Sequence, residues 1–132
     1  MPKYMLLQTY AQGEDCDVPM PEWAPEDIRA HIQFQHVLNA ELSEAGELVE
    51  AEGLAGPEAA KTVVADGKGG AVVTDGPFPE GKELLAGYRV VDVESEARAL
   101  EIATRVSAAP GPDGAPLRVP IEVRQVMSAP EV

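Results

Sequence analysis

Thr74-Asp75-Gly76-Pro77-Phe78-Pro79-Glu80 follows the short apolar run Ala71-Val72-Val73 in this chain of 132 residues. An acidic residue, a glycine and a proline in succession predict a sharp, rigid bend at the end of a strand. Gly76 can adopt a positive φ, and Pro77 restricts the residue before it to extended conformations. We therefore expect the Asp75 carboxylate to lie at the mouth of the space that the strands enclose.

Strands and helices alternate on both sides of this bend. Apolar runs bounded by turn residues predict strands at 3–11, 47–53, 60–66, 71–74, 85–92 and 117–126. Helices are expected from about 25 to 45, ending at Gly46, and from a cap at Asp92, Glu94 or Ser95 to about 107. Residues 12–24 form an irregular acidic, proline-rich loop. The order is βαβ, an inserted hairpin and βαβ, which predicts an α+β fold of the ferredoxin-like βαββαβ type.

The first predicted strand is apolar on both faces. Its alternating sets are Tyr4, Leu6 and Tyr10 on one side, and Met5 and Leu7 on the other. Two helices can cover one face of a sheet, so another element must cover the second. A partner subunit is the economical answer, and we expect a homodimer.

The composition limits the class of protein. A chain of this length forms one domain, residues 1–132, and 45% hydrophobic residues suffice for a core. The net charge of −13 argues against nucleic acid and against anionic membranes as partners. No signal peptide or membrane-length apolar run is seen, and the single cysteine, Cys16, fits a reducing compartment. We expect a cytoplasmic protein.

His31 is the candidate catalytic residue of the first helix. At about 100° per residue it lies in the middle of the apolar face, flanked by Ile28 and Leu38, whereas His36 lies at the flank. A buried imidazole needs a hydrogen-bond partner, and Asp75 is the best carboxylate available. A histidine oriented by Asp75 can act as a general acid or base. The competing interpretation is a core histidine bonded to a carbonyl group or to water.

Other side chains are candidates for binding a ligand, and some of them also have a purely structural interpretation. Gln35, on the same side as His31, Tyr88 and Phe78 are the candidate substrate-binding residues; Tyr88 can equally be packing, and Phe78 can fill the bend. Arg89 can bind an anion, although a solvated charge is the simpler interpretation. His31 and His36 are five residues apart and cannot chelate one metal ion, so we expect no metal. No cofactor motif is present, and we expect no cofactor.

Several stretches in order along the chain resemble the YCII-related (DGPF-domain) family. They include Lys3-Tyr4-Met5-Leu6-Leu7, Glu52-Gly53-Leu54, Val73-Thr74-Asp75-Gly76-Pro77-Phe78 and Gly87-Tyr88-Arg89-Val90-Val91-Asp92-Val93. The resemblance implies a ferredoxin-like domain that pairs into a dimeric α/β barrel. It also implies a suspected His-Asp site, with His31 and Asp75 at the matching positions. Most of the family has no assigned reaction.

Two functions are therefore considered. The first is a cofactor-free lyase, isomerase or dehalogenase-like enzyme that uses a His-Asp pair on a small organic substrate. The second is a non-catalytic module that binds a small molecule or regulates a partner, for example a sigma factor. The sequence does not identify the ligand.

Overall fold

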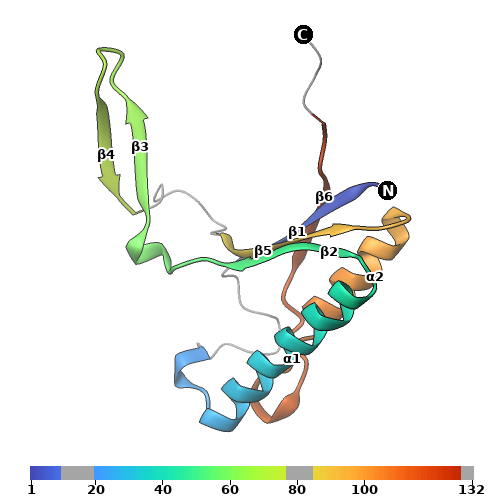
Figure 1. Ribbon diagram of the computed structural model, residues 1–132. Helices are drawn as coiled ribbons and strands as arrows, with labels where there is room; N and C mark the ends of the chain where they lie inside the picture. Colours follow the sequence, from blue (N-terminus) through green and yellow to red (C-terminus); the bar gives the residue numbers. More distant parts are fainter. Residues whose placement is uncertain (10–19, 77–84, 129–132) are drawn as a thin grey trace.

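The computed structural model describes residues 1–9, 20–76 and 85–128 (Figure 1). Four strands form one antiparallel sheet in the order β2-β5-β1-β6. The bounds are Lys3–Thr9 for β1, Leu48–Gly53 for β2, Leu85–Asp92 for β5 and Ile121–Gln125 for β6. Helix α1 spans Pro25–Glu44 and α2 spans Glu96–Ser107, and both lie on one face of the sheet (Figure 1). The remaining strands, β3 (Lys61–Ala65) and β4 (Ala71–Asp75), form a separate hairpin.

This element order confirms the predicted βαβ, hairpin, βαβ arrangement. Strands β1 and β2 run parallel on either side of β5, because each pairs with β5 in the antiparallel sense. The result is an α+β fold compatible with a ferredoxin-like domain. None of the helices in the described ranges is long and apolar enough to cross a membrane.

The main core lies between the two helices and the sheet. The fully buried side chains include Leu38 and Leu42 of α1, Val91 of β5 and Ile102 of α2. The buried residues of α2 are Ala99, Ile102, Ala103 and Val106, whereas Leu100 is 49% exposed. The turn of the helix that meets the sheet is centred on Ile102, because β1 and β6 both contact α2 from that side.

Helix α1 has the predicted bounds and a narrower buried face than predicted. Pro25 is placed at its start, and Gly46 follows its end with φ +75°, a conformation that glycine adopts without strain. The buried residues of the helix are His31, Leu38 and Leu42, whereas Ile32 is exposed. Leu38 and Leu42 hold the second half against the sheet. The first half stands off from the core and leaves space beside His31.

Strand β6 is shorter than predicted. Residues 117–120 were expected to belong to it, but Arg118 has φ +59° and Pro120 lacks the amide donor of a ladder bond. Leu117 and Val119 instead join Trp23 in a second, smaller buried cluster. The strand lies at one edge of the four-stranded sheet.

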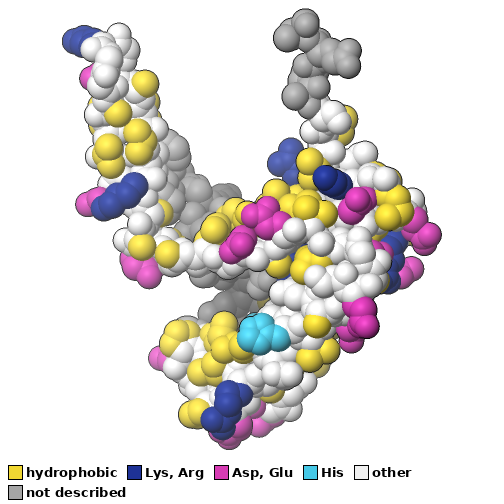
Figure 2. Space-filling model, viewed as in Figure 1, with side chains coloured by type: hydrophobic (Ala, Val, Ile, Leu, Met, Phe, Trp, Pro, Cys, Tyr) yellow, Lys and Arg dark blue, Asp and Glu magenta, His cyan; other side chains and the backbone are white. Residues whose placement is uncertain are grey.

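The β3–β4 hairpin stands away from the sheet and helices (Figure 1). Cross-strand pairing joins Val63 to Val73 and Val64 to Val72, and all four are between 55% and 61% exposed. Figure 2 shows the resulting hydrophobic surface along the hairpin. Gly76 ends it with φ +83°, as the bend predicted.

An ion pair ties the start of α2 to the segment between α1 and β2. Arg98 donates from Nε and Nη2 to the two carboxylate oxygens of Glu47, at 2.9 and 2.8 Å. Glu47 is 14% exposed, and the hydrogen bond from Arg98 lowers the pKa of its carboxyl. This two-pronged contact is stronger than a typical surface pair.

Replacing Glu47 by glutamine should therefore lower the free energy of unfolding by about 1–2 kcal/mol at neutral pH. A carboxyl whose pKa is lowered by folding stabilises the fold above its unfolded pKa, and the contribution disappears as the pH falls through the folded value. The stabilities of the wild type and Glu47→Gln in urea denaturation should thus begin to converge as the pH falls below the ordinary pKa of 4.5, and should meet below the lower folded value. Glu101→Gln is the matched control, since Glu101 also bonds Arg98 but is 66% exposed. A cost at Glu101 equal to that at Glu47 would contradict this account.

Candidate functional site

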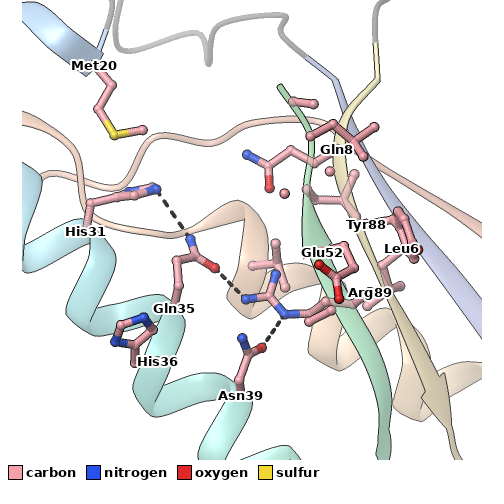
Figure 3. Close-up of a pocket in the computed structure, with 17 residues that line it drawn as sticks. Leu6, Gln8, Met20, His31, Gln35, His36, Asn39, Glu52, Tyr88 and Arg89 are labelled. Atoms are coloured by element: carbon pink, nitrogen blue, oxygen red, sulfur yellow. Dashed lines mark hydrogen bonds between the residues drawn. The ribbon is translucent and has the colours of Figure 1, made fainter. Parts of the chain in front are cut away.

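A pocket of about 470 Å³ opens between the middle of α1 and strands β1, β2 and β5. Its walls are partly apolar, with Leu6, Met20, Val106 and Ile121 among them. Polar residues from both the helix and the strands line it: Gln8, His31, Gln35, His36, Asn39 and Arg89, with Glu52 and Tyr88 at its border (Figure 3). The pocket therefore combines an apolar lining with hydrogen-bonding groups, as small-molecule sites do.

The local structure explains why these polar groups meet. His31, Gln35 and Asn39 are four residues apart along α1 and so lie on one stripe of the helix. Arg89 lies two residues before Val91, which is fully buried against the helices, so both share the inward face of β5. Figure 3 shows the stripe of α1 facing Arg89 across the pocket.

These residues form a continuous hydrogen-bonded chain. Arg89 donates from Nε to Asn39 Oδ1 at 2.8 Å and from Nη2 to Gln35 Oε1 at 2.5 Å. Gln35 Nε2 lies 3.4 Å from His31 Nε2, and His31 Nδ1 lies 3.0 Å from the carbonyl oxygen of Pro110. A carbonyl oxygen can only accept, so Nδ1 of His31 carries the proton. Because the oxygen of Gln35 accepts from Arg89, its amide nitrogen faces the imidazole and donates to Nε2.

The orientation of His31 is fixed from two further sides. The indole ring of Trp23 contacts the imidazole edge-on, with ring centroids 5.6 Å apart and an interplanar angle of 81°. Both side chains are buried, each 8% exposed. The ring is thus held by Trp23 and the Pro110 carbonyl, and its Nε2 lone pair points to the Gln35 side of the pocket.

His31 was predicted to be inward-facing, and the structure confirms its burial. The predicted His31–Asp75 pair is not formed within one chain. Asp75 is 85% exposed and forms an ion pair with Lys61 on the hairpin, while the polar contacts of His31 are those to Pro110 and Gln35. The carbonyl partner is the alternative that the sequence left open. Asp75 pairs with Lys61 and not with His31 because the cross-strand register of the hairpin places Lys61 directly opposite Asp75.

The other predicted site residues divide between the pocket and elsewhere. Gln35 contacts His31 as described, and His36 is exposed at the pocket's edge. Tyr88 borders the pocket, but its hydroxyl donates to Glu50 Oε1 at 3.0 Å, a bond that raises the pKa of the phenol. Phe78 lies outside the described residues, as do residues 12–19 of the predicted acidic loop.

Arg89 and Asn39 are the pocket residues that sequence reasoning missed or undervalued. Arg89 is not a solvated charge but is 8% exposed, and burial lowers the pKa of its guanidinium. The alternation of Arg89 with the apolar Val91 on the predicted strand 85–92 was the available signal. Asn39 follows from the same argument, since it is one turn after Gln35 on the helix.

No cluster of three or more His, Cys, Asp or Glu side chains able to hold a metal ion occurs in residues 1–9, 20–76 and 85–128. In the pocket, the side chain of Gln35 joins two functional groups. Its amide nitrogen faces Nε2 of the His31 imidazole, and its amide oxygen accepts from the Arg89 guanidinium. Such an arrangement can bind a polar ligand and move a proton.

Comparison with known proteins identifies the family. No curated protein matches the chain. Residues 3–119 match the family model of the YCII-related domain, a range that includes the first βαβ unit, the inserted hairpin, β5, α2 and all residues of the polar chain. With that match over most of its length, the chain belongs to the YCII-related domain family.

Proposed function

We propose that this protein is an enzyme that transfers a proton on a small organic molecule, with His31 as the general acid and base. The observation that supports the proposal is a buried imidazole with a fixed tautomer, whose Nε2 faces the pocket. Lyase, isomerase and dehalogenase-like reactions all include such a step. The side chains described here supply it without a bound cofactor.

The geometry indicates how the proton moves. The contact from Gln35 to Nε2 is 3.4 Å, which is long for a hydrogen bond, so an acidic proton of a ligand can compete for the same lone pair. After accepting that proton, the ring still donates from Nδ1 to the Pro110 carbonyl, and it can return a proton from Nε2 to another atom of the ligand. In this scheme Pro110 and Trp23 position the ring, the role first assigned to Asp75.

Proton exchange in deuterated water tests the proposal without knowledge of the natural substrate. A panel of small ketones, 2-oxo acids and halogenated acids is incubated with the protein and followed by proton NMR. We expect deuterium to enter the carbon acid of at least one compound faster than in buffer. Binding of panel members with exchange only at the buffer rate would contradict catalysis and would favour the second function, a non-catalytic binding module.

We also propose that the chain forms a homodimer through the sheet face that the helices leave open. Tyr4 and Leu6 are buried in the core, so Met5 and Leu7 point to the opposite face, beside their cross-strand neighbours Val90 and Tyr88. An apolar strip at the centre of a sheet face that neither described helix covers is a surface that a second subunit would bury. A second chain would also bring its own hairpin, and with it a second Asp75, near the first chain.

Sedimentation at micromolar concentration should give about twice the 14.0 kDa of one chain. Replacing Leu7 by glutamate should shift the protein toward the monomer, because it buries a charge in the interface. Val37→Glu is the control, since Val37 is 44% exposed on α1, away from this face. A monomeric wild type, or a dimer unaffected by the charge at residue 7, would exclude the sheet interface.

A further inference from the structure

Arg89 is a buried cation that has no carboxylate partner among the residues that the structure describes. Its neighbours Asn39 and Gln35 accept through neutral amide oxygens. No ion pair within the described ranges includes Arg89. Glu52, the carboxylate among the described lining residues, is exposed and makes no such contact. Burial of an unpaired charge costs free energy that these two hydrogen bonds only partly offset.

The free side of the guanidinium faces the pocket. Nε and Nη2 form one edge of the planar group, and that edge is taken by Asn39 and Gln35. The second edge, between Nη1 and Nη2, has no partner among the described residues. In the described part of the chain, Asp92 Oδ1 is the one fully buried side-chain nitrogen or oxygen atom that lacks a hydrogen bond. Nη1 of Arg89 has no hydrogen bond either, so it is not fully buried. Two parallel N–H groups on a pocket wall match the two oxygens of a carboxylate.

We propose that the ligand of this pocket is an organic carboxylate, bound in a two-pronged contact by the free edge of Arg89. This inference deepens the proposed function, on which it rests, by naming the substrate class. The apolar wall of Leu6, Val106 and Ile121 suits the organic part of such a ligand. A single cation suits a carboxylate better than a phosphate group, which carries more charge. The protein's net charge of −13 repels anions in general, so the attraction must be local to Arg89.

The same contact would orient the ligand for the proton step. Gln35 bonds Arg89 through its oxygen and faces His31 through its nitrogen, so one side chain spans the two groups (Figure 3). A carboxylate on the free edge of Arg89 would therefore share the pocket with His31, which lies at the other end of the Gln35 side chain. Arg89 is a binding residue in this scheme, while Gln35 and Asn39 are positioning residues for its guanidinium.

Benzoate and its neutral isostere benzamide are the probes. The chain has one tryptophan, Trp23, which contacts His31 at the pocket, so its fluorescence reports binding to the full-length protein. We expect benzoate to bind at least about tenfold more tightly than benzamide, because a charge-assisted pair is lost with the amide. Arg89→Met should abolish the preference, and Arg89→Lys should retain part of it through the charge alone.

The wild-type comparison stands even if a variant fails to fold. In the wild type, the NMR signal of the Arg89 Nε–H group should shift with benzoate and not with benzamide. Equal affinities for the two probes, no binding of either, or an undiminished preference in a folded Arg89→Met protein would overturn the inference. His31→Gln should keep the benzoate preference, so loss of proton exchange and loss of carboxylate binding are separable. An Arg89-dependent preference without exchange would support this inference while contradicting the catalytic proposal.

Discussion

Replacing His31 by glutamine should slow the proton exchange of a bound ligand by about 10²-fold or more, the usual contribution of a positioned acid or base. Glutamine can still donate to the Pro110 carbonyl and fill part of the space beside Trp23. It has no nitrogen that accepts a proton at neutral pH. The chemistry is therefore lost while the contacts that hold α1 in place are largely kept.

The measurement is the exchange rate at saturating ligand, with circular dichroism and benzoate affinity as checks on fold and pocket. His36→Gln is the comparison variant, because it removes the other histidine of the chain from an exposed position on the same helix. Its effect should be at least about tenfold smaller than the effect at residue 31, since the ring of His36 is not part of the polar chain. Similar losses at both positions would mean that His31 is not the specific acid or base.

The site residues of α1 could be predicted because helical periodicity is a local property. The spacing of Ile28, His31 and Leu38 sufficed to place the imidazole on the inward face, and burial confirms it. Its partner could not be predicted in the same way. The bond to Pro110 joins residues 79 positions apart, and any backbone carbonyl of the chain is an equally plausible acceptor.

The partner of Asp75 was predictable and was missed. The expected strands 60–66 and 71–74, joined by a short turn, predict an antiparallel hairpin that brings Lys61, near the start of the first strand, close to Asp75, just after the second. The structure shows this pairing, with Lys61 in an ion pair with Asp75. A nearby opposite charge on the paired strand is a simpler partner than a histidine on a distant helix. Cross-strand pairing therefore takes precedence over residue type when a carboxylate lies in a hairpin.

Arg89 shows a different limit of sequence reasoning. A charged residue is normally exposed, and that general tendency outweighed the strand alternation that placed Arg89 beside Val91. The burial of Arg89 is tolerable because Asn39 and Gln35 on the facing helix accept its hydrogen bonds. Whether they can do so depends on how α1 lies over β5. Such an arrangement between elements is a tertiary property, and it appears in the structure as the bonds to both amides.

The packing of α1 against the main core leads to the second prediction with a large effect, which concerns the free energy of unfolding. Replacing Leu38 by alanine should lower the free energy of unfolding by about 3 kcal/mol, because the side chain is 1% exposed and its removal leaves a cavity in the main core. Leu38 and Leu42 are the two buried apolar residues of this 20-residue helix. The ion pair between Arg105 and Glu41 also joins α1 to α2, but both side chains are more than 40% exposed, and such pairs contribute about 1 kcal/mol or less.

Urea denaturation of Leu38→Ala and Val37→Ala checks this prediction with neighbouring substitutions. Val37 is 44% exposed, so its truncation should change stability by no more than about 0.5 kcal/mol. A loss below about 1 kcal/mol at Leu38 would mean that the core is not what holds the helix. Leu38 directly precedes Asn39, so a looser α1 should also weaken the bond from Arg89 to Asn39. We therefore expect folded Leu38→Ala to bind benzoate more weakly than Val37→Ala, because the guanidinium is positioned from the helix that Leu38 anchors.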